Sequence, residues 1–331
     1  MDLTTFWFIL IAVLWVGYLV LEGFDFGVGM LMAVLARNDK ERRVLLNTIG
    51  PVWDANEVWL LVAGGATFAA FPEWYATLFS GFYLPLLLIL VALIVRIIGI
   101  EFRSKRPEAS WRLRCDIAIV LGSVVPALLW GVALANIVRG VPIDADKEYV
   151  GGLLDLLNPY GLLGGLVTLS LFLVHGAFFV GLKTVGDIRE RAITLGLRVG
   201  ALAATLLTIF VVWTAARDGD AAVWVLGLLV IAALGAAMVS ARRRRDGWAF
   251  AGTAVAIGLL VVTLFAALFP DVMVSSLDPA WSLTTTNASS TAYTLKIMSW
   301  VAVVFTPIVL IYQSWSYWVF RRRIGVHHIP G

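Results

Sequence analysis

The chain has 331 residues, of which 60% are hydrophobic and only 14% charged, and its mean hydropathy is +0.90. Soluble domains are typically about 45–50% apolar and about 25% charged, so these values exclude a large soluble domain and indicate an all-α, polytopic integral membrane protein. The net charge of +3 is small, and the single cysteine, Cys115, excludes an internal disulfide framework and a cysteine-rich metal site.

Nine apolar segments are long enough, at about 20 residues each, to cross a bilayer as helices. No basic residue precedes the first of them, so we interpret it as a membrane helix and not as a cleaved signal. Together they predict a single transmembrane domain over residues 1–331, with approximate spans at 5–35, 51–71, 79–100, 116–138, 160–182, 195–215, 221–240, 247–269 and 296–319.

The loops between these segments alternate sharply in Lys and Arg. One set of loops, with the C-terminal tail, carries 20 of the 25 basic residues, whereas the other set carries four. Because positive loops stay on the cytoplasmic side, the N-terminus is predicted outside and the C-terminus in the cytoplasm, which requires an odd number of spans. The four basic residues of the outer side are Arg139, Lys147, Arg217 and Lys296.

Acidic residues interrupt the first two spans. Glu22 and Asp25 lie three residues apart in the first, and Asp54 and Glu57 lie three apart at the head of the second. Residues at this spacing share a helix face, and carboxylates in lipid are costly and mark ion paths, proton paths or paired sites. The short connection 36–47, interpreted as a loop, makes the two spans antiparallel neighbours.

The third span adds Arg96 near its inner end and Glu101 at that end. Six ionisable groups are therefore expected to converge on the cytoplasmic side. Five acids cannot all be neutralised by one arginine, so the excess acids must be hydrated or protonated. This favours a proton-uptake route, with Arg96 as the charge partner. A structural knot of ion pairs near the membrane interface is the alternative interpretation.

Histidine is scarce, which limits haem binding. Only His175 lies within a predicted span, while His327 and His328 lie in the C-terminal tail. Several histidines or methionines at facing depths would be needed for a set of haems, so no cofactor or metal is expected on this chain, and His175 is expected to be hydrogen-bonded to a neighbour. Nothing in the sequence supports nucleic-acid binding.

Several segments resemble subunit II of the cytochrome bd-type quinol oxidases, in a compact, actinobacterial-like form with a short outer loop at 216–221. The match covers nearly the whole chain, and the Trp-Asp-Ala-Asn run within 37–72 is its most specific part. The matching segments include GFDFGVGML (23–31), RNDKERRVLLNTIGPVWDANEVWLLVAGGATFAAFP (37–72), LLNPYGLLGGLV (156–167), KTVGDIRERA (183–192) and YQSWSYWVF (312–320).

The resemblance implies a multi-pass protein of the bacterial cell membrane with nine helices. It implies a partner, subunit I, that carries two b-type haems, one d-type haem and the quinol site, and a complex that reduces O2 to water with cytoplasmic protons. Acids matching Asp54, Asp25 and Glu101 are associated in the family with the proton route. Glu57 stands where some relatives have an amide, and Glu22 where relatives have aspartate.

Two other functions stay open at this point. The chain could be a purely structural or assembly scaffold for the haem subunit, or a secondary transporter, although a transporter predicts inverted repeats and broken helices at the midplane. The sequence also leaves open which quinone is used, whether small single-span accessory subunits bind, and whether a membrane lipid or quinone occupies a groove in this chain.

Overall fold

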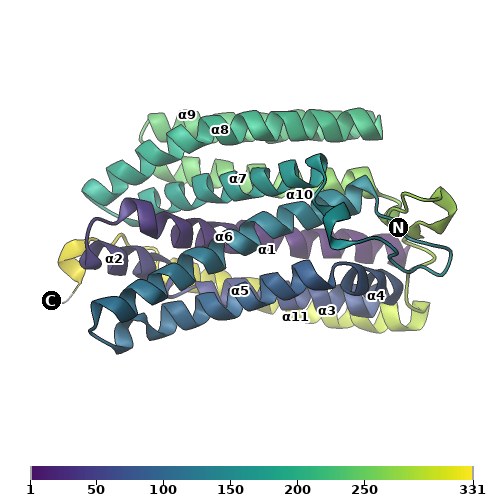
Figure 1. Ribbon diagram of the computed structural model, residues 1–331, viewed down its shortest axis with the longest axis horizontal. Coiled ribbons are helices and arrows are strands. Elements are labelled where there is room, and N and C mark those ends of the chain that lie inside the picture. Colours follow the sequence, from purple (N-terminus) through teal and green to yellow (C-terminus); the bar gives the residue numbers. More distant parts are fainter. Residues whose placement is uncertain (1, 330–331) are drawn as a thin grey trace.

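A computed structural model describes residues 2–329 and shows a bundle of long helices that lie roughly side by side (Figure 1). The helices are α1 (Leu3–Leu35), α2 (Asp39–Ile49), α3 (Trp53–Ala70), α4 (Pro72–Gly81), α5 (Tyr83–Phe102), α6 (Ala109–Arg139), α7 (Pro159–Lys183), α8 (Asp187–Asp218), α9 (Ala221–Arg242), α10 (Asp246–Leu268) and α11 (Ala292–Val319). Two short antiparallel strands, β1 (Asp271–Met273) and β2 (Leu283–Thr284), lie in the loop between α10 and α11.

Eight of the described helices are long and apolar enough to cross a membrane: α1, α5, α6, α7, α8, α9, α10 and α11. The prediction of an all-α membrane bundle is therefore confirmed, while the count of nine is not. The remaining predicted span, 51–71, corresponds to α3, which has 18 residues. Its first two turns carry Asp54, Asn56 and Glu57, and these polar residues lower its mean hydropathy.

One local prediction was wrong, and two further elements were not expected. The connection 36–47 is not a loop, because most of it belongs to the amphipathic helix α2, whose N-cap Asn38 accepts a hydrogen bond from the backbone of Glu41. A further helix, α4, lies between α3 and α5. The outer segment 270–295 contains the β1–β2 hairpin.

The centre of the bundle is α7, and its contact with α1 is unusually close. A Cβ atom on Gly27 would lie 2.1 Å from the backbone oxygen of Phe172 and 2.7 Å from the Cα atom of Gly176. The Gly23–Gly27 pair thus lets two backbones meet, as small residues do between membrane helices. The two helices α7 and α11 differ greatly in burial. In the most apolar 18-residue stretch of each helix, 78% is buried in α7 and only 6% in α11.

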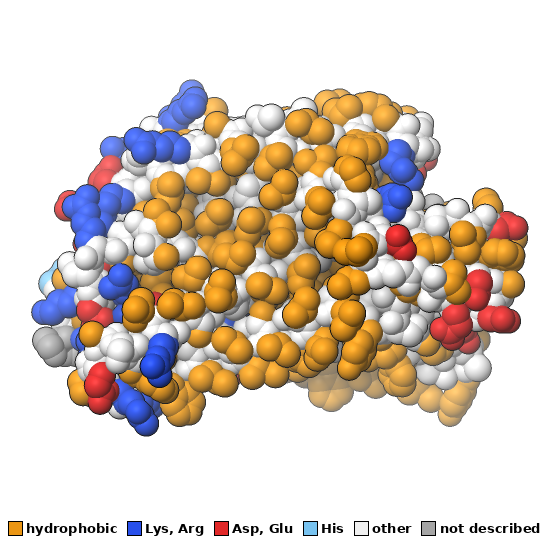
Figure 2. All heavy atoms as spheres, viewed as in Figure 1, with side chains coloured by type: hydrophobic (Ala, Val, Ile, Leu, Met, Phe, Trp, Pro, Cys, Tyr) orange, Lys and Arg blue, Asp and Glu red, His pale blue; other side chains and the backbone are white. Residues whose placement is uncertain are grey.

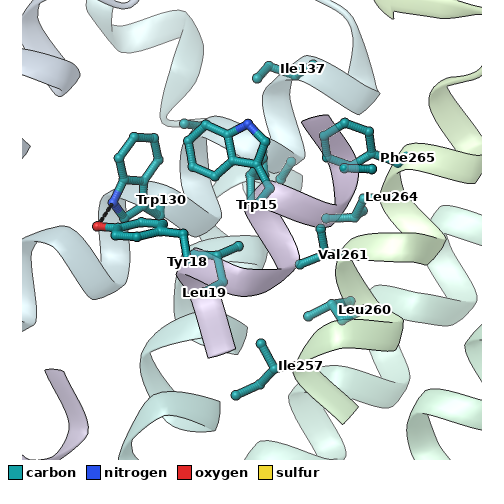
Figure 3. Close-up of a cluster of buried hydrophobic side chains, with 14 of the residues drawn as sticks. Trp15, Tyr18, Leu19, Trp130, Ile137, Ile257, Leu260, Val261, Leu264 and Phe265 are labelled. Atoms are coloured by element: carbon teal, nitrogen blue, oxygen red, sulfur yellow. Dashed lines mark hydrogen bonds between the residues drawn. The ribbon is translucent and has the colours of Figure 1, made fainter. Parts of the chain in front are cut away.

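An aromatic cluster joins α1, α6 and α10 (Figure 3). The indoles of Trp15 and Trp130 meet edge to face with centroids 4.9 Å apart, and the Trp130 N–H donates a 3.1 Å hydrogen bond to the Tyr18 hydroxyl. The side chains of Leu264 and Phe265 approach from α10. Because the one polar pair in this group is satisfied, the cluster packs as apolar core between the three helices.

The two ends of the bundle differ in charge. The N- and C-termini lie at opposite ends (Figure 1), and Figure 2 shows most Lys and Arg side chains at the end that holds the C-terminus, acidic side chains at the other, and a broad hydrophobic band between them. At the basic end, Arg103 donates to Asp39 of α2 at 2.8 Å and to Asp116 of α6 at 2.5 Å. We call the basic end of the bundle the inner end.

Candidate functional site

The candidate site lies where α1, α3, α5 and α11 meet, in the inner half of the bundle. Glu22 and Asp25 of α1 are both fully buried, although they are only three residues apart. Buried carboxylates need partners or protons, and Glu22 and Asp25 have different partners. Glu22 turns to α5 and Asp25 turns to α3, so the site has two halves.

The first half is an ion pair. The Arg96 guanidinium of α5 donates through Nη1 to Glu22 Oε1, and both side chains are fully buried. The Arg96 Cζ atom also lies 4.7 Å from the centre of the Phe26 ring, which is within the range of a cation–π contact. This pair neutralises one acid and one base within the apolar bundle.

The second half is a chain of hydrogen bonds that ends on Asp25. Trp59 Nε1 donates to Gln313 Oε1 at 2.8 Å, Gln313 Nε2 donates to Asn56 Oδ1 at 3.2 Å, and Asn56 Nδ2 donates to Asp25 Oδ2 at 2.7 Å. The Tyr317 hydroxyl also donates to Asn56 Oδ1, at 2.7 Å. Side chains of two helices, α3 and α11, therefore hold one carboxylate of a third helix, α1.

The direction of this chain follows from its first member. An indole N–H can only donate, so the oxygen of Gln313 must face Trp59 and its NH2 must face Asn56. The Asn56 oxygen is then occupied, and its NH2 must face Asp25. One oxygen of Asp25 is thereby fixed as an acceptor.

Several buried polar atoms at the site have no partner within the described protein. They are Glu22 Oε2, Asp25 Oδ1, Glu57 Oε2, and Arg96 Nε and Nη2. Glu57 is half-buried and lies in the electrostatic field of Glu22, Arg96 and Asp54. Buried polar groups are normally satisfied by protein or by ordered water. Ordered water bound between these side chains would satisfy these atoms.

Two of the predicted site residues do not enter this cluster. Asp54 and Glu101 are exposed, and their side chains form no hydrogen bond or ion pair with any other residue of 2–329. The expected convergence of six groups is therefore too broad: Glu22, Asp25, Arg96 and Glu57 come together, Asp54 stands at the edge beside Glu57, and Glu101 stands apart. Glu101 is five residues beyond Arg96, which places it about 140° around the helix.

The sequence interpretation did not assign roles to Asn56, Gln313 or Tyr317. A signal was present for one of them, because Gln313 is the only amide in the 28 residues of α11, and polar side chains within membrane helices are usually paired. Which helix would receive that amide could not be deduced from spacing alone.

His175 is buried and satisfied at both ring nitrogens. Nε2 lies 3.1 Å from the backbone oxygen of Val20, and Nδ1 lies 2.7 Å from the Thr253 hydroxyl. The ring also stacks on Phe250, with centroids 4.6 Å apart. These contacts confirm the expected hydrogen-bonded role. Within residues 2–329, no three His, Cys, Asp or Glu side chains are grouped so that they could hold a metal ion.

A large apolar cavity lies toward the outer half, between α3, α4, α5 and α6. Its volume is about 470 Å³, and its walls include Trp15, Phe68, Leu90 and Trp130. The buried Trp74 indole N–H also lines it and has no partner in the described protein. Its size and lining suit a hydrocarbon chain and not a polar substrate.

The comparisons with known proteins decide the family. Residues 3–320 match the model of "Cytochrome bd terminal oxidase subunit II". The chain belongs to this family. It is 45% identical over 325 residues to "Cytochrome bd ubiquinol oxidase subunit 2" of Bacillus subtilis, with 96% of each chain covered. It is 38% identical to "Cytochrome bd-I ubiquinol oxidase subunit 2" of Escherichia coli, with 96% of this chain and 94% of that protein covered.

The fold of this subunit II chain is also present in a solved structure. It is similar to a chain in the structure of bd oxidase from Geobacillus thermodenitrificans, with a TM-score of 0.66, 18% identity, and coverage of 97% of this chain and 99% of that one. The alignment with the Escherichia coli relative spans 361 positions, more than the 331 residues of this chain, so that relative carries insertions. The chain is thus a multi-pass membrane subunit of a bacterial respiratory bd oxidase.

Proposed function

We propose that this chain is the haem-free partner of subunit I in a quinol:O2 oxidase and that Asp25 passes cytoplasmic protons toward the haems of that partner. The observation that carries the proposal is the asymmetry of the Asp25 carboxylate. Asn56 holds Oδ2, while Oδ1 is buried and has no partner in the described protein. A relay needs one oxygen that can take up and release a proton and a geometry that holds it in place.

The proposed relay runs from the inner end toward Asp25. Asp54 and Glu101 are exposed and would collect protons, Glu57 is half-buried, and Asp25 is fully buried. Water bridging the unpartnered oxygens of Glu57, Glu22 and Asp25 would connect them. Glu22 is the least suited to carry a proton, because its Oε1 is engaged by Arg96.

The same proposal includes nine membrane spans, with α3 as the ninth, the N-terminus outside and the C-terminus in the cytoplasm. The opposite placement of the two termini and the basic inner end support it. It also includes a lipid or quinone tail in the cavity of about 470 Å³. Two b-type haems, one d-type haem and the quinol site are assigned to subunit I, and small accessory subunits stay a possibility of the family.

Subunit I is expected to dock on α11. Only Leu295 and Gln313 of this helix are buried, and aromatic side chains such as Trp300, Trp315 and Trp318 are exposed. A membrane helix that is this little packed has most of its surface free for lipid or for another protein. The visible spectrum of the purified complex tests the pairing: the haem absorbance should stay with a second, larger subunit and be absent from this chain alone.

One specific observation favours a scaffold role as the second candidate. The Glu22–Arg96 pair is sealed from solvent and joins α1 to α5, as a structural contact would. The scaffold function needs no titrating Asp25, so the two candidates differ in what the loss of that carboxylate does.

The deciding experiment replaces Asp25 by Asn in the assembled complex. The relay predicts that haem content and assembly stay near wild type while turnover at saturating quinol falls at least tenfold, in the range general acid–base groups contribute. Asp146→Asn, the same substitution at an exposed outer residue, is the matched control and should keep full turnover. Full turnover in Asp25→Asn would leave only the scaffold, and loss of haem would make Asp25 an assembly residue.

A further inference from the structure

The segment that follows α11 is tied to the inner end of the bundle by ion pairs. Asp246, at the start of α10, is buried and accepts from two arginines. Arg189 of α8 donates to its two oxygens at 2.8 and 3.0 Å, and Arg323 of the C-terminal tail donates to Oδ2 at 2.8 Å. Asp246 therefore connects α8 and α10 to the tail.

The backbone of the tail is also held. Lys183, the last residue of α7, donates through Nζ to the carbonyl of Phe320, and its own carbonyl accepts from the Ile324 N–H at 2.8 Å. Thr184 and Ile324 form a parallel bridge. Further on, Ile329 is buried in the apolar cluster that includes Val44 of α2. The tail thus runs across the ends of α7 and α10 before it reaches α2.

This attachment matters because α11 has little packing of its own. At its outer end the Trp7 indole donates to the Leu295 carbonyl and the Ser299 hydroxyl, at 3.2 and 3.1 Å. At its inner end the side chains that reach into the bundle are Gln313 and Tyr317, which lie four residues apart on one face and both donate to Asn56. Rotation or sliding of α11 would move both donors away from Asn56.

The tail begins within one helical turn of Tyr317. Phe320, whose carbonyl receives Lys183, is three residues beyond Tyr317, which is about 4.5 Å along a helix. Arg323 follows three residues later. The rotation and height of Tyr317 are therefore fixed by contacts that lie outside the membrane-spanning part of the helix.

We infer that Asp246 and Arg323 are positioning residues for the proton site: they clamp the tail so that Tyr317 and Gln313 hold the Asn56 amide against Asp25. The clamp rests on the proposed function, because it acts on Asp25. The Asp246–Arg323 ion pair, at the inner end of the bundle, would thereby affect turnover without carrying a proton itself.

The test compares substitutions at two arginines in the assembled, haem-loaded complex. Arg323→Gln removes the tail contact and leaves Arg189 on Asp246. Arg244→Gln is the matched control. Arg244 is also an arginine of the inner end, and it pairs with Glu190, which in turn contacts Arg189. Unlike Arg323, Arg244 does not hold the tail. Tyr317→Phe and the double variant Arg323→Gln/Tyr317→Phe complete the set.

Three quantities are measured: kcat and KM for quinol, hydrogen exchange of segments 53–60 and 313–324, and the infrared carboxyl band that Asp25→Asn removes. The clamp predicts that Arg323→Gln and Tyr317→Phe each lower kcat about three- to tenfold, the range expected for one lost hydrogen bond, with KM unchanged. Both variants should shift the Asp25 carboxyl band, and hydrogen exchange of both segments should become faster in Arg323→Gln. The kcat of the double variant should be no lower than that of the slower single variant. Arg244→Gln should behave as wild type.

Other outcomes contradict the clamp. If Arg323→Gln speeds exchange at 313–324 but leaves kcat and the Asp25 band unchanged, the tail is only a structural strap. If the two kcat effects multiply in the double variant, they are independent. Arg323→Lys keeps the charge and is judged by the same criteria should Arg323→Gln lose haem. If Asp25→Asn itself keeps full turnover, the relay fails, and exchange at 53–60 alone decides whether the tail holds α11 against Asn56.

Discussion

Trp59 determines which end of the Asn56 amide faces Asp25, although the Gln313 side chain lies between Trp59 and Asn56. The Trp59 N–H starts a chain of donors through Gln313 and Asn56 that ends on Asp25 Oδ2. Because an indole cannot accept a hydrogen bond, neither amide can turn around without losing a bond. The orientation of the buried carboxylate is thereby set from a residue on α3.

Trp59→Phe should release this orientation. Without the indole donor, Gln313 can flip, and then Asn56 no longer has a unique orientation toward Asp25. We expect turnover to fall about threefold to tenfold, which corresponds to the roughly 0.5–1.5 kcal/mol of one buried hydrogen bond. Turnover of the haem-loaded complex measures this. Trp248→Phe, at an indole that is 70% exposed, is the control, and an equal loss in both variants would contradict the account.

The buried pair of Glu22 and Arg96 should be sensitive to the loss of either partner alone. Glu22→Gln and Arg96→Gln each leave a buried charge unpaired, which typically costs about 3–5 kcal/mol. The double variant leaves no charge and should recover most of the yield of haem-containing complex. A double variant that assembles worse than either single variant, with the two losses adding, would show that the two residues act independently.

Gly27→Ala tests the contact between α1 and α7. The new methyl group would overlap the backbone of Phe172 and Gly176, and overpacking of this kind typically costs about 1–3 kcal/mol. The thermal unfolding midpoint of the complex should fall. Gly64→Ala makes the same change in α3 where no atom lies within 4 Å, and its midpoint should stay within error of wild type. A fall of equal size in both would count against close packing.

Glu41 should make the docking of α2 pH-dependent. Burial raises the pKa of its carboxyl, but the Arg37 backbone N–H and the Arg191 guanidinium lower it more, so the pKa lies below its ordinary value of 4.5. A lowered pKa means that the folded protein favours the carboxylate. This stabilisation is therefore full above about pH 5.5 and is lost as the pH falls through and below 4.5.

The measurement for Glu41 is the difference in thermal midpoint between the wild type and Glu41→Gln. It should be constant at neutral pH and shrink toward zero as the solution is acidified below about pH 4.5. A difference that does not change with pH would mean that Glu41 contributes packing only, without its charge.

Much of this architecture could be predicted from the sequence because membrane helices are long and apolar. Eight predicted spans have matching helices. The partners of Glu22 and Asp25 within the acidic site could not be predicted. Glu22 and Asp25 are only about 60° apart around α1, yet one faces α5 and the other α3.

The reason lies in the apolar surface of these helices. When nearly every side chain is hydrophobic, the sequence pattern does not say how far each helix is rotated toward its neighbours. Asp54 was therefore expected inside and lies outside, whereas Gln313, on a helix that is mostly exposed, reaches the centre. The helix α2 was missed for a different reason, since its Asn38 cap and buried Val44, Leu45, Thr48 and Ile49 were a readable amphipathic pattern.

The most direct test of the relay is proton uptake during a single turnover. The fully reduced complex, in vesicles with its inner end facing the outer medium, is mixed with O2, and a pH-sensitive dye in that medium reports the protons taken up. The account predicts that Asp25→Asn, with its haems intact, takes up protons at least tenfold more slowly than wild type, as for loss of an acid–base group, while Asp146→Asn does not. Uptake at the wild-type rate in Asp25→Asn would contradict it.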